Sequence, residues 1–255
     1  MDKTLKQRLQ ADEPLVGCFV MLPSPGVVEM CGYAGFDFVI LDQEHGAAGT
    51  ESLENQIRAA EASGVSALVR IPEASPSMAQ HALDAGAEGL LVPHITSAEV
   101  ARQIVAAAHY PPQGARGMAT TSRAGRHGTV TVDDHLKRSL ERTLVMLQIE
   151  DRAVLPDVEE IAGMDGVDAL FIGPADLSVS LGHPGNPGHP EVAAEIDRIV
   201  ATAKRVGRAK VATFARNEAN AESWRKDRGV EVLCLSTTAI FVDALKALSG
   251  ALVRR

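Results

Sequence analysis

The stretch GVDALFIGPADLS at residues 166–178 joins a glycine turn, a short apolar run and a polar loop that starts with Gly-Pro. Two earlier segments are built in the same way, AGFDFVILD at 34–42 and AGAEGLLVP at 85–93. In all three, a glycine turn of the kind that leads from a helix into a strand precedes the apolar run. The runs do not alternate in polarity, which is typical of strands buried on both faces of a parallel sheet. The stretch therefore predicts an α/β fold with a buried parallel sheet.

Similar apolar runs recur along the whole chain. Eight have strand character: 15–21, 36–41, 67–71, 89–92, 144–149, 169–172, 211–214 and 230–235. Alanine-rich stretches with helical spacing lie between them, at 27–34, 52–63, 78–85, 98–107, 192–206, 219–227 and 238–248. Eight strands alternating with helices over roughly 250 residues are typical of a (β/α)₈ TIM barrel, so we predict one such domain over residues 1–255. A doubly wound open sheet is the alternative, but it favours a glycine-rich loop after the first strand, and LPSPG at 22–26 is not such a loop.

One segment interrupts the alternation. Residues 110–137 read YPPQGARGMATTSRAGRHGTVTVDDHLK, which is too long for an ordinary connection between a strand and a helix. We predict an extended loop here that serves as a lid, a binding loop or an interface element.

Composition narrows the class of protein. The chain has 33 acidic and 25 basic residues and a net charge of −8, which argues against a nucleic-acid or membrane partner, although a few arginines can still bind an anionic substrate. Cys18, Cys31 and Cys234 lack zinc-site spacing, so we expect buried, reduced thiols. The polar start MDKTLKQRLQADEP lacks the apolar core of a signal peptide, and no apolar run approaches the roughly 18 residues of a membrane span. We therefore expect a cytoplasmic protein.

Polar residues follow five consecutive predicted strands. In chain order they are Asp42, Glu44 and His45, then Arg70, then His94 after Pro93, then Gln148, Glu150 and Asp151, and finally Asp176. In TIM barrels the catalytic residues lie at the C-terminal ends of the strands. Helix capping explains any single case, but five together favour convergence on one functional mouth of the barrel.

Glu150 and Asp176 are candidate metal ligands. Two carboxylates at neighbouring strand ends can hold a hard divalent cation and leave positions open for substrate and water. The alternative is a pair of solvated loop carboxylates. The metal site is favoured because Glu150 ends an apolar run, where its charge needs a partner, and because Asp176 lies in a tight Gly-Pro-Ala-Asp turn. Asp151 is the weaker candidate, since consecutive residues point in different directions.

His45 and Arg70 are candidates for proton transfer and for carboxylate binding. His45 lies three residues beyond Asp42, whose carboxylate could hold the imidazole and raise its basicity, as in a general base. A loop histidine that caps the next helix is the alternative. The guanidinium of Arg70 suits a carboxylate of either substrate or protein, so a salt bridge to Asp42 or Glu44 is equally compatible.

Several common catalytic motifs are absent. The chain has no GxxxxGK[ST], GxSxG or HExxH motif. Only Lys210 lies near a predicted strand, at its start, so a mechanism through a lysine Schiff base is not expected.

Six segments together resemble a known family. They are LDQEHG at 41–46, VRIP at 69–72, LDAGAEGLLVPHI at 83–95, YPPQGARG at 110–117, QIED at 148–151 and GVDALFIGPADLSVSLG at 166–182. With them the chain closely resembles the HpcH/HpaI family of class II pyruvate aldolases, which includes 4-hydroxy-2-oxoheptanedioate aldolase and 2-keto-3-deoxy sugar-acid aldolases. The resemblance implies reversible cleavage of a 4-hydroxy-2-oxo acid to pyruvate and an aldehyde. It also implies a pyruvate enolate stabilised by Mg²⁺, Mn²⁺ or Co²⁺.

The resemblance also assigns roles to residues. It implies a homo-oligomer, a trimer or a hexamer, whose C-terminal helix packs on a neighbouring subunit. It implies metal binding by Glu150 and Asp176, and general base catalysis by His45 with support from Asp42 and from Asp84 of a neighbouring subunit. It implies substrate binding by Arg70, Gln148 and the amides of Ala175 and Asp176. Arg123 is implied to contact an adjacent active site.

Two departures leave the aldehyde open. His127 stands where relatives often carry an aromatic residue, and KVATFARNE at 210–218 is not a close match although we expect it to face the aldehyde pocket. A citryl- or malyl-CoA lyase is one rival, which would need a basic surface for nucleotide phosphates. A non-catalytic barrel that acts as a binding protein is the other, and the intact set of polar residues speaks against it.

Overall fold

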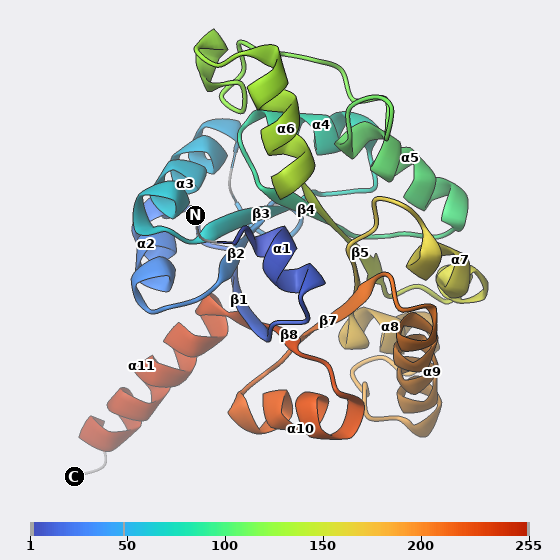
Figure 1. Ribbon diagram of the computed structural model, residues 1–255. Helices are drawn as coiled ribbons and strands as arrows, with labels where there is room; N and C mark the ends of the chain where they lie inside the picture. The colour runs from blue at the N-terminus through green and yellow to red at the C-terminus, as the bar shows by residue number, and fades with distance from the viewer. Residues whose placement is uncertain (1–2, 48, 254–255) are drawn as a thin grey trace.

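Eight parallel strands form a closed barrel in chain order (Figure 1). The computed structural model describes residues 3–47 and 49–253, so both extreme ends of the predicted 1–255 domain lie outside the described residues. The predicted strand runs are all confirmed to within two residues, and so is the TIM barrel. The strands are β1 (Leu15–Val20), β2 (Phe38–Asp42), β3 (Ser66–Arg70), β4 (Gly89–Val92), β5 (Leu144–Ile149), β6 (Ala169–Ile172), β7 (Lys210–Phe214) and β8 (Val232–Ser236).

Helices surround the barrel and alternate with its strands (Figure 1). Four of them, α2, α4, α8 and α9, start with a proline in the first turn, where the missing N–H costs nothing. The outer helices are α2 (Pro25–Tyr33), α3 (Thr50–Ser63), α4 (Pro76–Asp84), α5 (Ala98–Ala108), α7 (Val158–Gly163), α9 (Pro190–Val206), α10 (Glu218–Arg228) and α11 (Thr237–Val253), with the shorter η2 (Arg152–Asp157) and α8 (Pro174–Ser180) in the connections around β6.

A short helix that the sequence analysis missed closes one end of the barrel. Helix α1 (Leu5–Gln10) starts with a capping box, in which Thr4 and Gln7 bond each other's backbone amides. Leu5 and Leu9 are buried in the inner barrel cluster, with residues such as Leu15 from the N-terminal ends of the strands. Figure 1 shows α1 lying across the centre of the ring. The C-terminal end of the barrel therefore remains as the open mouth.

The predicted loop at 110–137 is a loop only in its first part. It contains the 3-10 turn η1 (Arg126–Gly128) and then helix α6 (Val132–Arg142), so the prediction was wrong for residues 132–137. The helix starts there because the hydroxyl of Thr131 accepts a hydrogen bond from the amide of Asp134 at 3.1 Å.

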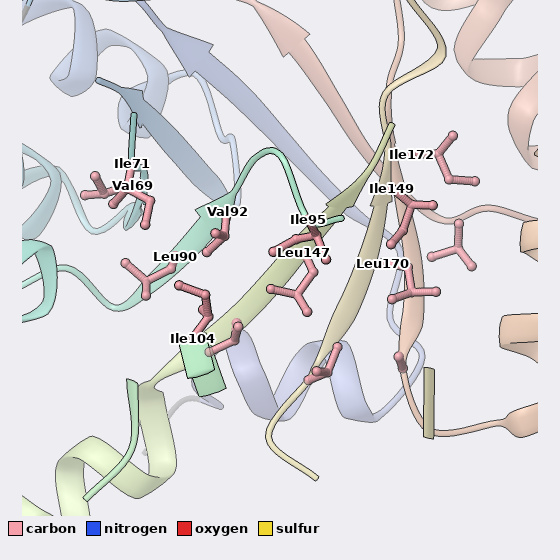
Figure 2. Packing of buried hydrophobic residues seen from close by; sticks show 14 of the residues in the cluster. Val69, Ile71, Leu90, Val92, Ile95, Ile104, Leu147, Ile149, Leu170 and Ile172 are labelled. Carbon is pink, nitrogen blue, oxygen red and sulfur yellow. The ribbon is translucent and has the colours of Figure 1, made fainter. Parts of the chain in front are cut away.

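Alternate strand residues face opposite sides of the barrel wall. Figure 2 shows that outward residues, among them Val69, Leu90, Leu147, Ile149 and Ile172, pack together with Ile104 of α5. Their neighbours in the chain face the barrel axis, where Phe19, Leu91, Met146 and Phe171 form the inner cluster. Cys18, Cys31 and Cys234 are buried and free, as predicted.

The C-terminal helix α11 extends away from the barrel (Figure 1). Several apolar residues along it are exposed, by between 37% and 70% for Phe241, Leu245, Leu248 and Leu252. Among the residues that the structure describes, no helix combines the length and apolar character needed to cross a membrane.

Candidate active site at the barrel mouth

Strand alternation selects the side chains that reach the mouth. Val69 and Ile71 face outward, so Arg70 between them faces the barrel axis. Ile149 faces outward as well, and Gln148 and Glu150 on either side of it face inward by the same rule. Asp42 ends β2 next to the outward Leu41 and is buried. The predicted convergence of these four residues at the C-terminal ends of the strands follows from this two-residue period.

Arg70 and Asp42 form a buried, two-pronged ion pair. Nε of Arg70 lies 2.9 Å from Oδ1 of Asp42, and Nη2 lies 2.6 Å from Oδ2. Nη1 of Arg70 lies 3.1 Å from Oε2 of Glu44, and the guanidinium stacks over the ring of Phe19 at 4.9 Å. The salt bridge that the sequence analysis held as an alternative is therefore present. The guanidinium carries five N–H groups, so at least two of them remain for a ligand.

His45 lies at the mouth, but Asp42 does not hold its imidazole. The Asp42 carboxylate instead accepts the backbone N–H groups of Glu44 at 3.1 Å and His45 at 3.2 Å. The imidazole is 59% exposed, and its Nε2 lies 3.7 Å from Oε1 of Glu44. The carboxylate next to the imidazole is thus that of Glu44, because Asp42 is already committed to Arg70.

Glu150 is a buried carboxylate with two partners. It is 5% exposed; Oε1 accepts the backbone N–H of His94 at 3.0 Å, and Oε2 accepts Nε2 of Gln148 at 2.5 Å. Burial is the main cause that raises the pKa of Glu150; the N–H of His94 opposes it, and the charges of Asp176 and Glu44 add to it. The amide oxygen of Gln148 is buried without a hydrogen-bond partner. Burial and the neighbouring carboxylates therefore outweigh the donors that stabilise the ionised form of Glu150.

The Gly-Pro-Ala-Asp turn places Asp176 beside Glu150. Helix α8 begins with Pro174, and Asp176 lies exposed in its first turn, where backbone amides have no partner within the helix. A side chain at Gly173 would meet Oε2 of Glu150 at 2.8 Å. Glycine is therefore needed for the close approach of this turn to Glu150. Asp151 instead caps η2 through the amide of Ala153, which agrees with its weaker candidacy.

A cavity of about 720 Å³ opens at this mouth. Five of the predicted residues line it, namely Asp42, Arg70, Gln148, Ala175 and Asp176. The wall opposite comes from β7, α9 and α10 and is largely apolar, with Phe214, Ile196 and Trp224 beside Arg216. The stretch 210–218, which departs from the family pattern, thus faces the same cavity as Arg70.

Asp84 and Arg123 lie elsewhere in the chain. Asp84 ends α4 and bonds Arg116 at 2.6 Å, whereas Arg123 bonds Glu61 at 2.6 Å. Arg123 lines a second cavity of about 520 Å³ with His127, near the N-terminal ends of β4 and β5. Within one chain, neither residue reaches the mouth.

Two residues at the mouth were left without a site role by the sequence analysis. Glu44 joins Arg70, His45 and His94, and His94 joins Glu44 to Glu150. Their place directly after β2 and β4 was the available signal. A separate cluster lies before and in the first turn of α9, where His183, His189 and Glu191 place donor atoms within 4.8 Å of one another.

Known proteins match over most of this barrel. The family model described as HpcH/HpaI aldolase/citrate lyase matches residues 15–233. The chain is 36% identical over 246 residues to 5-keto-4-deoxy-D-glucarate aldolase of Klebsiella pneumoniae, covering 96% of this chain and 95% of the relative. It is 39% identical over 203 residues to pyruvate aldolase of Rhizobium etli, covering 80% and 79% of the two chains.

A solved structure agrees with this match. The HpcH/HpaI aldolase from Desulfitobacterium hafniense has a TM-score of 0.91 at 30% identity and covers 100% of this chain and 98% of its own. The expected resemblance is thereby confirmed. The chain belongs to the HpcH/HpaI aldolase/citrate lyase family and is an aldolase, a carbon–carbon lyase.

Proposed function

We propose that the protein is a divalent-metal-dependent aldolase that cleaves a 4-hydroxy-2-oxo acid reversibly to pyruvate and an aldehyde. The observation that carries the proposal is the buried carboxylate of Glu150 at the barrel mouth, close to Asp176 and Arg70, which both line the mouth cavity. Relatives named pyruvate aldolase and 5-keto-4-deoxy-D-glucarate aldolase support a reaction that releases pyruvate.

The residues at the mouth fit a metal ion. Glu150 is buried with a raised pKa, so a cation beside it would stabilise its ionised form. Asp176 offers a second carboxylate, and the two oxygens suit Mg²⁺, Mn²⁺ or Co²⁺. When bound, such an ion would supply a Lewis acid that stabilises negative charge on the 2-oxo oxygen of the substrate.

The chain's own groups would handle the rest of the reaction. Two or more free N–H groups of Arg70 would donate to the pyruvate oxygens as charge develops during cleavage of the C3–C4 bond. The amides of Ala175 and Asp176, in the first turn of α8, would receive the pyruvate carboxylate. The exposed imidazole of His45, with Glu44 rather than Asp42 beside it, would take the proton from the 4-hydroxyl.

Asp84 and Arg123 would take part only from a neighbouring copy. Each is held away from the mouth of its own chain, and the apolar residues of α11 are exposed. A trimer or hexamer in which α11 packs on a neighbour would meet both observations. Sedimentation analysis tests this assembly, and a monomer would remove Asp84 and Arg123 from the mechanism. A cytoplasmic location stays a prediction.

Proton exchange on pyruvate tests the proposed function without knowledge of the aldehyde. The protein is incubated with pyruvate in D₂O, with and without Mg²⁺, and the methyl proton signal is followed by NMR beside an Asp176→Asn control. Loss of the signal that requires metal and is abolished by the substitution supports enolate formation at this site. No exchange with any metal contradicts the proposal and favours a CoA-thioester lyase or a non-catalytic barrel, which a thioester assay separates.

A further inference from the structure

The second cavity, of about 520 Å³ near the N-terminal ends of β4 and β5, is rich in arginine. Within the described part of the chain, Glu61 and Glu88 are its only acidic lining residues. Its basic side chains include five arginines, namely Arg116, Arg123, Arg126, Arg138 and Arg142. The whole chain has a net charge of −8, so this excess of positive charge is local. Cavities of this size commonly hold small molecules, and this one shares no lining residue with the mouth cavity.

Three of the five arginines are neutralised by carboxylates. The pairs, with N–O distances between 2.6 and 2.8 Å, are Arg116 with Asp84, Arg123 with Glu61, and Arg142 with Glu88. These pairs use both glutamates that line the cavity. Among the residues that the structure describes, Arg126 and Arg138 have no carboxylate partner, so their charges remain available to a ligand.

The two unpaired arginines are close enough to repel each other. Nη2 of Arg138 donates to the backbone oxygen of Ala124 at 2.6 Å, a bond that leaves the charge of the guanidinium uncompensated. Burial is the main cause that lowers the pKa of Arg138. The charges of Arg126 and Arg142 lower this pKa further, and each outweighs the opposite effect of either lining glutamate. Positive charge therefore predominates around Arg138, and a bound anion would relieve the repulsion.

Arg116 adds a buried donor without an acceptor. Its side chain is 2% exposed, is fixed by Asp84 at 2.6 Å and stacks over the ring of Tyr110 at 4.7 Å. The Nε of this guanidinium has no hydrogen-bond partner among the described residues. Buried N–H groups in proteins nearly always have a partner, so an acceptor oxygen beside Arg116 in the cavity would supply a missing contact.

We propose that this cavity binds a phosphate dianion, either free phosphate or the phosphate group of a small metabolite, through Arg126 and Arg138. A phosphate group carries a charge of about −1.5 to −2 at pH 7, which matches two unpaired guanidinium groups. Its oxygens accept the parallel N–H groups of arginine in pairs. Arg126 belongs to the turn η1 and Arg138 to helix α6, so the anion joins the end of the long loop to the helix that follows it. The inference is independent of the proposed function, because neither arginine lines the mouth.

Phosphate binding tests the inference directly. Isothermal titration with inorganic phosphate should show one site per chain in the wild-type protein. Arg126→Asn and Arg138→Gln should each weaken binding by about tenfold or more, since a hydrogen bond to a charged group contributes at least that much. Asparagine tolerates the left-handed backbone at residue 126, where φ is +49°, so this variant keeps the turn. Phosphate should also raise the midpoint of thermal unfolding of the wild-type protein, and raise it much less in either variant.

The controls separate this site from other accounts of anion binding. Arg58→Gln removes an exposed guanidinium of α3 outside both cavities, and it should leave phosphate binding unchanged. Glycerol 3-phosphate distinguishes the two sources, because tighter binding than that of phosphate indicates a phosphorylated metabolite and weaker binding indicates free phosphate. Succinate that binds as tightly as phosphate would overturn the preference for phosphate, and pyruvate that displaces phosphate would overturn a site separate from the mouth. Absence of binding to the wild-type protein, or undiminished binding in both arginine variants, overturns the inference as a whole.

Discussion

Gly173→Ala is a small change that should disturb the proposed metal site through steric contact with Glu150. Gly173 lies in the Gly-Pro-Ala-Asp turn with φ −101°, a conformation that alanine can adopt. The new methyl group would lie 2.8 Å from Oε2 of Glu150 and 3.1 Å from its Cβ. The consequence is therefore steric and falls on Glu150, one of the two proposed metal ligands.

The size of the effect follows from these distances. Ordinary contact begins at 3.4 Å, so Oε2 must move by about 0.6 Å, or the turn with Asp176 must move instead. Glu150 cannot move freely, since the N–H of His94 and the amide of Gln148 hold its two oxygens at 3.0 and 2.5 Å. A misplacement of about 1 Å at a catalytic centre costs about a hundredfold in rate, so we expect pyruvate exchange to fall by about ten- to a hundredfold. Overpacking should also lower the free energy of unfolding by about 1–3 kcal/mol.

Mg²⁺ titration and proton exchange on pyruvate provide the assay, with urea unfolding beside them. Gly163→Ala is the matched control, because its methyl group would meet only Val206 at an ordinary 3.6 Å, on a helix remote from the mouth. The control should bind Mg²⁺ like wild type. The reasoning is refuted if Gly173→Ala keeps wild-type Mg²⁺ affinity and exchange rate while folding normally.

Three further outcomes are expected. Arg70→Met should lower the free energy of unfolding by about 3 kcal/mol, because it leaves Asp42 buried and unpaired, and adding Asp42→Asn should recover part of the loss in urea unfolding. Burial lowers the pKa of His109, so the folded state binds this proton less tightly than the unfolded state. The contribution to stability should be full above the unfolded-state pKa of about 6.5 and should fall below it by at most about 1.4 kcal/mol per pH unit. His109→Gln should reduce this slope. Chelation of the metal should weaken pyruvate binding by at least about tenfold, as measured by calorimetry. The reason is that a single charge pair near a protein surface contributes about 4 kcal/mol at 4 Å. Unchanged binding would contradict a metal-assisted site.

Much of the mouth was predictable because strands have a period of two. Once β3 and β5 were recognised as buried strands, the polar residues at their ends could only face the barrel axis, as Arg70, Gln148 and Glu150 do. The Gly-Pro-Ala-Asp turn was likewise readable, because Pro174 and Asp176 are residues that begin helices.

The partnerships between side chains were not readable from spacing. Asp42 and His45 are three residues apart, but the carboxylate is taken by Arg70, which is 28 residues further along the chain. Asp84 and Arg123 were assigned through the resemblance alone, and both lie near the opposite end of their own barrel. Helix α1 was missed because its short apolar pattern is informative only once the barrel end that it closes is known.

The charges at the mouth explain why metal and substrate binding should be coupled. Four carboxylates gather there, those of Asp42, Glu44, Glu150 and Asp176, and Arg70 is the guanidinium that pairs with the first two. Glu150 and Asp176 add negative charge beside a cavity, lined by Asp176, that would receive an anionic 2-oxo acid. A divalent cation on these two carboxylates, as proposed above, would turn this repulsion into attraction. Because Arg70 is already paired with Asp42 and Glu44, its field on the substrate is partly cancelled, and the proposed cation would add attraction for the pyruvate end.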